Sequence, residues 1–173
     1  MRDELKRPGW DDYYMGIAHA VAARSNCVRR SVGALIVVGK SIISTGYNGS
    51  PMGVRNCSDG GCPRCASDAA PGVGYDTCIC VHAEQNAFLF AARHGNATEG
   101  GTLYTTLRPC FGCAKEAIQA GIREIVFAGT EEYEAELEEG YRQLIAESGL
   151  FFRHCRSDAL SVPVDPRPAP SVR

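Results

Sequence analysis

The sequence has no long hydrophobic run, no strong net charge and few aromatic residues. Its longest apolar runs, residues 34–38 and 87–92, are far shorter than the ~20 residues that a membrane-spanning helix needs. A formal net charge of −2 over 173 residues argues against a protein that coats nucleic acid. The first ten residues (MRDELKRPGW) contain no apolar segment, so we expect no secretory signal and a cytoplasmic location.

Cysteine is the residue type that the sequence has in excess. There are nine cysteines, against four histidines and one tryptophan. An odd number suits a framework of disulfides badly, and closely spaced cysteines in a reducing compartment are typical of metal ligands or catalytic thiols.

The length fits one domain, and the composition, 45% hydrophobic and 22% charged, is typical of a globular one. Periodicity and turn residues predict helices at about 11–24, 82–94, 110–120 and 131–148, and strands at 32–38, 41–47, 102–107, 123–128 and 150–154. The first two strands form a hairpin through Gly39 and Lys40. A hairpin followed by alternating helices and strands predicts an α/β fold: a single three-layer domain whose mixed five-stranded sheet is flanked by helices. Residues 48–80 show no period, and a loop of that length needs a function or an internal clamp.

Two short segments carry residues suited to catalysis, each at the start of a predicted helix. One holds His82 and Glu84, and the other holds Cys110 and Cys113 in the pattern Pro-Cys-x-x-Cys. Three ligands leave one tetrahedral position of a zinc ion open for water, which is the pattern of a catalytic site. Glu84 is placed to act as general acid and base on that water. His-x-Glu combined with Pro-Cys-x-x-Cys is the signature of zinc-dependent nucleobase deaminases.

The chain resembles the zinc-dependent cytidine and deoxycytidylate deaminases, and within them the deoxycytidylate (dCMP) branch. The segments that carry the resemblance are 25–34 (SNCVRRSVGA), 45–51 (TGYNGSP), 82–87 (HAEQNA) and 109–115 (PCFGCAK). The resemblance runs from about Trp10 to Ala128 and implies a cytidine deaminase-like fold. We expect the deaminase domain to span residues 1–155, including loop 48–80, and the four prolines of residues 156–173 to indicate an extended tail. The resemblance also implies hydrolysis of dCMP to dUMP and ammonia, with Glu84 moving protons between water and the base.

The resemblance further assigns residues to the nucleotide. Asn48 is expected to hydrogen-bond the nucleoside, and Ala83 to contact the substrate. The 5′-phosphate needs cationic partners, for which the candidates are Arg29, Arg30 and Arg108. Members of the branch often bind dCTP or dTTP as effectors within homo-oligomers. The residues expected to contact such effectors are Gly46, Tyr47 and Gly49.

Six of the remaining cysteines gather in or beside loop 48–80, and Cys155 is expected to be a core residue. A structural zinc held by four thiolates would supply the clamp that the loop needs. Cys62 and Cys65 are expected to share one metal, completed by Cys57 and Cys80, with Cys27 and Cys78 as alternates. The competing interpretation is that some of them are small buried hydrophobic residues.

Two other functions fit the same residues less well. The first is deamination of a modified cytosine nucleotide or a nucleoside. The second is a nucleic-acid-binding protein with a deaminase fold, which the slightly negative net charge and the absence of a basic stripe disfavour. No membrane partner is expected.

Overall fold

The computed structural model describes residues 7–70, 73–129 and 134–155, and it has the predicted α/β architecture. The helices are α1 (Trp10–Ala22), α2 (Pro63–Ala66), α3 (Ala83–Arg93), α4 (Phe111–Gln119) and α5 (Ala135–Ser148), with short 3-10 turns η1 (Cys57–Asp59) and η2 (Tyr75–Thr77). The strands are β1 (Gly33–Val38), β2 (Ser41–Tyr47), β3 (Thr102–Thr105), β4 (Glu124–Phe127) and β5 (Phe151–His154). The proline-rich tail and the predicted start of the last helix at 131–133 lie outside the described residues.

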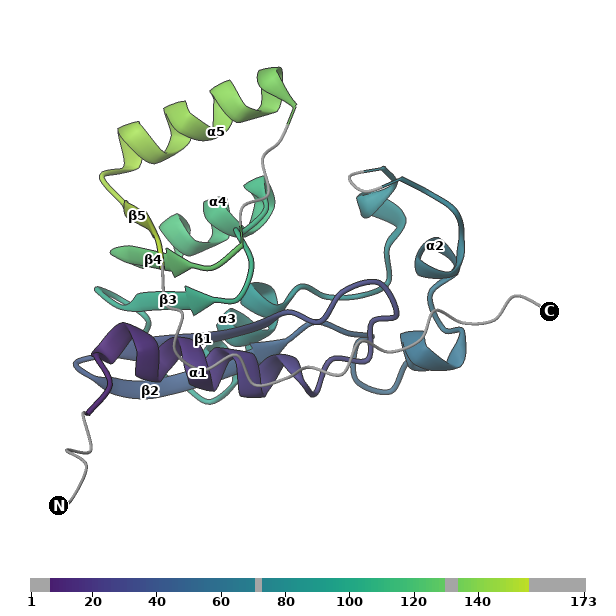
Figure 1. The fold of residues 1–173 in the computed structure, drawn as a ribbon, viewed down its shortest axis with the longest axis horizontal. Helices are drawn as coiled ribbons and strands as arrows, with labels where there is room; N and C mark the ends of the chain where they lie inside the picture. The colour runs from purple at the N-terminus through teal and green to yellow at the C-terminus, as the bar shows by residue number, and fades with distance from the viewer. Residues whose placement is uncertain (1–6, 71–72, 130–133, 156–173) are drawn as a thin grey trace, which may run out of the picture.

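The five strands form one mixed sheet in the order β2-β1-β3-β4-β5 (Figure 1). β1 pairs antiparallel with β2 and β3, whereas β3, β4 and β5 run parallel. The predicted hairpin turn is confirmed: Gly39 and Lys40 both have positive φ, at 54° and 68°, as a two-residue turn of this kind requires.

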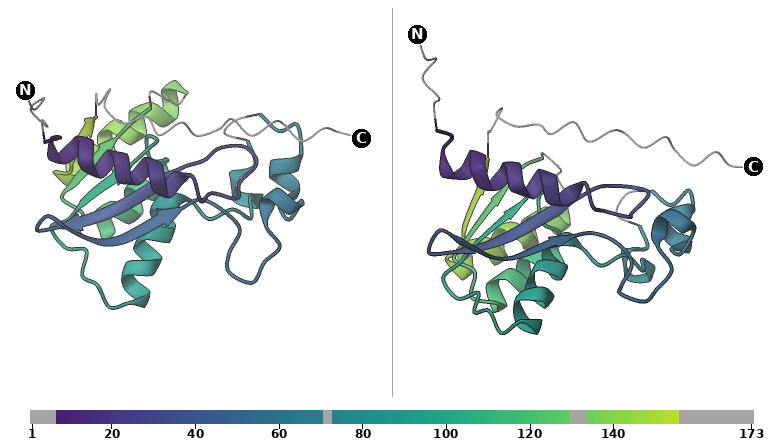
Figure 2. Two further views of the ribbon diagram at one scale, coloured as in Figure 1. Left: turned by 60° about the horizontal axis from the view of Figure 1, so that its bottom comes forward. Right: turned by 90° about the horizontal axis from the view of Figure 1, so that it is seen from below.

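Alternating residues of the strands divide the core into two layers. On one face, Leu35 and Tyr104 pack against α1. On the other face, Ile36 and Leu103 pack against the alanines of α3, such as Ala87. Because side chains of a strand alternate between faces, one buried sheet is covered by helices on both sides. The views in Figure 2 show α1 on one face and α3 and α4 on the other.

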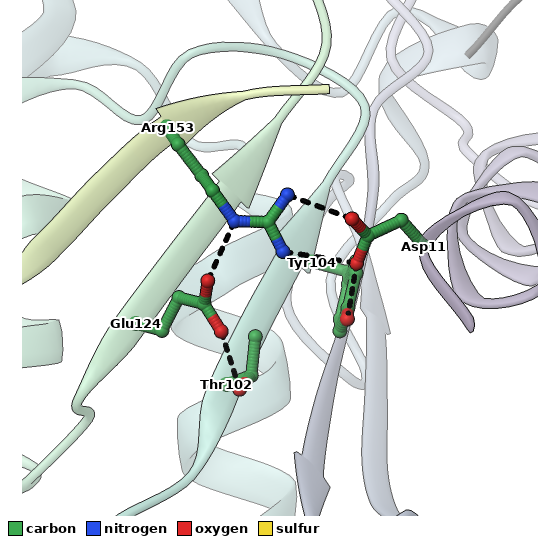
Figure 3. A network of polar contacts seen from close by, with 5 residues as sticks. All are labelled: Asp11, Thr102, Tyr104, Glu124 and Arg153. Carbon is green, nitrogen blue, oxygen red and sulfur yellow. Dashed lines mark hydrogen bonds and ion pairs between the residues drawn. The ribbon is translucent and has the colours of Figure 1, made fainter. Parts of the chain in front are cut away.

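A polar network fastens α1 across the strands (Figure 3). Arg153 of β5 donates to both carboxylate oxygens of Asp11, at 2.7 and 3.0 Å, and to Glu124 of β4 at 2.6 Å. Tyr104 donates to Asp11 at 2.9 Å, and Thr102 donates to Glu124 at 3.3 Å. The Arg153 guanidinium holds the pKa of Asp11 below its ordinary value. The network therefore links the first helix of the chain to the last strand.

Residues 48–70 and 73–80 lie beyond one end of the sheet, and their regular structure is limited to α2 and the two 3-10 turns (Figure 1). Gly49 pairs with Val81 in an isolated bridge, so the two ends of the segment meet beside the start of α3. No helix in the described part of the chain has the length and apolar character needed to cross a membrane.

Candidate active site

The three predicted metal ligands lie together at the starts of two helices. His82 is the N-cap of α3, Cys110 is the N-cap of α4, and Cys113 lies in the first turn of α4. His82 Nδ1 is 3.4 Å from each of the two sulfurs. Tetrahedral zinc with ordinary Zn–S and Zn–N bond lengths places nitrogen and sulfur about 3.5 Å apart. The three side chains thus fit a zinc ion in number, chemistry and spacing.

Local hydrogen bonds fix both helix starts. The side-chain carbonyl of Gln85 accepts from the backbone N–H of His82 at 3.1 Å, and the sulfur of Cys110 accepts from the N–H of Cys113 at 3.4 Å. Gln85 also donates to Glu116 of α4 at 2.9 Å, which ties the two helices together. A hydrogen bond from Cys113, together with those from His82 and the Cys113 backbone, lowers the pKa of the Cys110 thiol to about 4. The thiolate is the form of cysteine that binds metal, and the N-terminus of a helix stabilises it.

Glu84 lies behind these ligands and is 4% exposed. One carboxylate oxygen accepts from the hydroxyl of Thr105 at 3.1 Å, and the other is 3.7 Å from the sulfur of Cys113. Burial raises the pKa of Glu84 above its ordinary value. A raised pKa makes the carboxylate a better proton acceptor, as a general base requires.

A cleft of about 470 Å³ opens over the three ligands. Its volume is in the range of small-molecule sites, ~300–1,000 Å³. Besides the metal ligands and two further cysteines, its walls include Tyr75, Gln85, Phe111 and Leu137. Sequence reasoning missed these wall residues. Phe111 stands between the two cysteines of the Pro-Cys-x-x-Cys motif and could have been found from it, whereas Tyr75 belongs to a stretch with no periodic signal.

Asn48 is buried, and its amide is bonded to the segment that precedes β1. Its Oδ1 accepts from the N–H of Val32 at 2.8 Å, and its Nδ2 donates to the carbonyl of Arg30 at 2.9 Å. These bonds fix the orientation of the amide. A role in binding the nucleoside stays a prediction and would use the second hydrogen and the second lone pair of the amide.

Arg29 is bonded to the backbone of the loop region. Arg29 donates to the backbone carbonyls of Cys65 at 3.1 Å, Ala69 at 2.6 Å and Ser67. Its planar fork therefore organises the chain after α2.

Arg108 forms a bidentate pair with Glu138 at 2.8 and 2.9 Å and lies over the ring of Tyr141. Its charge is thus compensated within the protein. Arg30 has an exposed side chain.

The residues expected to contact effectors have close packing partners. A Cβ on Gly46 would lie 2.2 Å from the carbonyl oxygen of Ala83, and a Cβ on Gly49 would lie 2.4 Å from Oδ1 of Asn26. The carbonyl of Tyr47 accepts from the side chain of Asn86 at 2.7 Å. Ala83 itself is fully buried in the first turn of α3. Close contact between β2 and α3 accounts for Gly46 and Tyr47, and contact with Asn26 accounts for Gly49; the effector role of the three stays a prediction.

The six other cysteines of the loop region come together beside the cleft. Their sulfurs form two groups of four that share two members: Cys27, Cys57, Cys65 and Cys80 in one, and Cys62, Cys65, Cys78 and Cys80 in the other. Cys57 and Cys62, expected on the same ion, thus fall in different groups. Cys155 lies apart, in the core beneath α1, as expected.

The model of the cytidine and deoxycytidylate deaminase zinc-binding region matches residues 8–129. The chain is 47% identical over 121 residues to the deoxycytidylate deaminase of Schizosaccharomyces pombe, which covers 70% of this chain and 37% of that protein. It is 44% identical over 128 residues to the deoxycytidylate deaminase of Mycobacterium phage D29, with coverages of 71% and 97%.

Among solved structures, the chain is similar to the dCMP deaminase from the cyanophage S-TIM5 in complex with dCMP and dUMP. The TM-score is 0.66 at 28% identity, covering 87% of this chain and 99% of that one. The matched region spans just over a third of the Schizosaccharomyces pombe relative and nearly the whole of the phage D29 relative. The family model covers well over half of the sequence, and the residues it matches include His82, Cys110 and Cys113, so the chain belongs to the cytidine and deoxycytidylate deaminase zinc-binding family.

Proposed function

We propose that this protein catalyses the hydrolytic deamination of dCMP to dUMP. The observation that carries the proposal is the buried carboxylate of Glu84 beside three correctly spaced zinc ligands, which themselves line a cleft of about 470 Å³. Support for dCMP as the substrate comes from relatives 44% and 47% identical to the chain that are deoxycytidylate deaminases.

His82, Cys110 and Cys113 are the residues that would hold the zinc ion. Bound there, zinc would supply Lewis acidity that lowers the pKa of a water in its fourth position towards ~7. The positive ends of α3 and α4 favour the negative charge that collects at this point.

Glu84 carries the proton transfers. Its carboxylate accepts one proton from the attacking water and passes it to N3 of the cytosine ring while the water oxygen bonds to C4. It then moves the second proton to the exocyclic amino group, the C4–N bond breaks, and ammonia leaves. The N3 proton stays on the product, which is the uracil of dUMP. Thr105 holds the carboxylate in place through its hydroxyl.

Binding of the 5′-phosphate requires charge-assisted hydrogen bonds. Arg29, Arg30 and Arg108 stay the three candidates: the guanidinium groups of Arg29 and Arg108 are also bonded to the protein, and the side chain of Arg30 is exposed. Control by dCTP or dTTP and assembly into a homo-oligomer are further parts of the proposal.

The substrate is tested by comparing kcat/KM for dCMP, CMP, deoxycytidine, dCTP and 5-substituted dCMP. We expect the highest value for dCMP. A preference for the nucleoside, or no activity with any monophosphate, would contradict the proposal. Deamination of single-stranded DNA in the same panel would favour the nucleic-acid alternative.

The role of Glu84 is tested by Glu84→Gln. Loss of a general acid and base costs roughly 10²–10⁴-fold in rate. We expect kcat to fall by at least that factor while zinc content and the circular dichroism spectrum remain those of the parent. The matched control is Glu139→Gln on α5, where the side chain is 79% exposed. Equal activity of the two variants would refute the role of Glu84.

A further inference from the structure

The six cysteines beside the cleft, which we call the sulfur cluster, form an arrangement that one metal ion does not explain. They come from four separate segments of the chain, and each group of four sulfurs lies within 4.8 Å of one another. Five of the six are buried, and Val28 and Ile79 pack around them. Only Cys65 and Cys80 belong to both groups.

The distances between sulfurs match the edges of metal tetrahedra. They are 3.9 Å for Cys27 and Cys65, 4.0 Å for Cys65 and Cys80, 3.6 Å for Cys65 and Cys78, and 3.8 Å for Cys62 and Cys78. A zinc ion with Zn–S bonds of ~2.3 Å separates the sulfurs of its ligands by about 3.8 Å. A disulfide would bring two sulfurs to ~2.05 Å. The spacing is that of thiolates around a metal rather than of cystines.

The number of ions follows from the two sulfurs, those of Cys65 and Cys80, that belong to both groups. Cys65 lies within 4.0 Å of Cys27 from the first group and of Cys78 from the second. A terminal thiolate binds one ion and lies close only to the other ligands of that ion. A bridging thiolate binds both ions and lies close to the ligands of each. We propose that the sulfur cluster binds two zinc ions, with Cys65 and Cys80 as bridging thiolates. Cys27 and Cys57 complete the first ion, and Cys62 and Cys78 complete the second.

Charge favours the second ion. Two dications with six thiolates carry the same formal charge as one dication with four thiolates. A single ion would leave two further thiols buried in the cluster without a metal. The second ion uses both of them and adds no net charge to be buried. Arg29, whose guanidinium lies on the carbonyl of Cys65, places a positive charge next to this anionic group.

The cluster would also shape the active site. Cys78 and Cys80 line the cleft, and only Val81 separates Cys80 from the catalytic ligand His82. Little regular secondary structure holds the loop, so metal binding would fix the conformation of the side of the cleft that Cys78 and Cys80 line. The sequence predicts one structural zinc in this loop, whereas the proposed pair uses two ions.

The first experiment is metal analysis of the full-length protein, reduced and purified from zinc-supplemented cells. We expect three zinc ions per chain, one of them at His82, Cys110 and Cys113. Cys78→Ala removes a terminal ligand and should lower the count to two, whereas Cys65→Ala removes a bridge and should lower it to one. Cys155→Ala is the control and should leave the count at three. A parent count of two, or equal loss from Cys65→Ala and Cys78→Ala, would overturn the pair.

A second measurement needs no variant, so a failure of folding cannot obscure the answer. In protein loaded with cadmium-113, NMR should correlate the β-protons of Cys65 and Cys80 with two cadmium resonances each, and those of Cys27 with one. Correlation of every cysteine with a single resonance would refute the bridge. Cys110→Ala distinguishes the proposed deaminase activity from the proposed pair of ions. It should abolish deamination and remove one zinc ion, while the two cadmium resonances of the sulfur cluster persist.

Discussion

Addition of one methyl group at Gly46 should disturb the candidate active site from a distance. In β2, Gly46 faces the first turns of α3, and a Cβ there would lie 2.2 Å from the carbonyl oxygen of Ala83 and 2.4 Å from the backbone nitrogen of Ala87. Both atoms are backbone, so no side-chain rotation can relieve the clash. Gly46→Ala therefore has to move α3 away from β2 by about 1 Å to restore ordinary contact.

Both stability and catalysis should suffer from that movement. Overpacking of a core costs about 1–3 kcal/mol, and ~1 kcal/mol shifts the melting temperature of a domain of this size by roughly 2–4 °C. His82 and Glu84 sit on the displaced end of α3, while Cys110 and Cys113 sit on α4. A misplacement of about 1 Å can cost ~10²-fold in rate. We expect kcat to fall by that order at temperatures where the variant is folded.

The same substitution elsewhere gives a matched control. Gly140 lies inside α5, and a Cβ there meets no atom within 4 Å. Gly140→Ala should stabilise the protein by roughly 0.5–1 kcal/mol and leave kcat unchanged. Thermal melts and initial rates of deamination on both variants test the reasoning. A Gly46→Ala protein with the stability and basal rate of the parent, altered only in its response to dCTP or dTTP, would refute the packing role and support an effector role.

Two further predictions concern polar contacts. Since Arg153 lowers the pKa of Asp11 below its ordinary 3.8, the stabilisation from their pair is fully present above about pH 4 and is lost as the pH falls through the folded-state pKa. Asp11→Asn should therefore lower the free energy of unfolding by about 0.5–1 kcal/mol at pH 7, a value discounted for the partial exposure of both side chains. In urea melts, the stabilities of parent and variant should converge below pH 4. A difference in stability that is the same at every pH would contradict the ion pair. Arg29→Lys should lose the fork that holds three carbonyls, costing about 1.5–3 kcal/mol and raising hydrogen exchange over residues 64–70. A rise in KM for dCMP with unchanged exchange would instead identify Arg29 as a phosphate ligand.

Much of the fold could be predicted because its signals are local. The turn at Gly39 and Lys40 depends on two adjacent residues with positive φ. The layers follow from alternation along each strand, as in Leu35 and Ile36. Two ends were predicted two residues too far: the first helix, predicted to reach about residue 24, ends at Ala22. The strand predicted to reach residue 107 ends at Thr105, where its parallel pairing with β4 ends at Phe127.

The interior of the loop could not be predicted because its order depends on contacts between distant residues. Cys27 meets Cys65, and Arg29 meets the carbonyl of Ala69 across forty positions of the chain. No periodicity in residues 48–80 encodes such contacts. The cysteine count indicated a metal, but only the three-dimensional arrangement shows that Cys65 and Cys80 belong to both groups of sulfurs.

The sulfur cluster precedes the catalytic ligands in the order in which the chain is made. All six of its cysteines have been synthesised once Cys80 is added, whereas Cys110 and Cys113 follow about thirty residues later. At ~5–20 residues per second, that interval is roughly 2–7 s. Eight closely placed thiols could bind metal in many incorrect combinations. Because the chain is synthesised from its N-terminus, the six thiols of the sulfur cluster are made before those of Cys110 and Cys113. The order of these cysteines along the chain thus separates in time the ligands of the two proposed metal sites, which lie side by side in space.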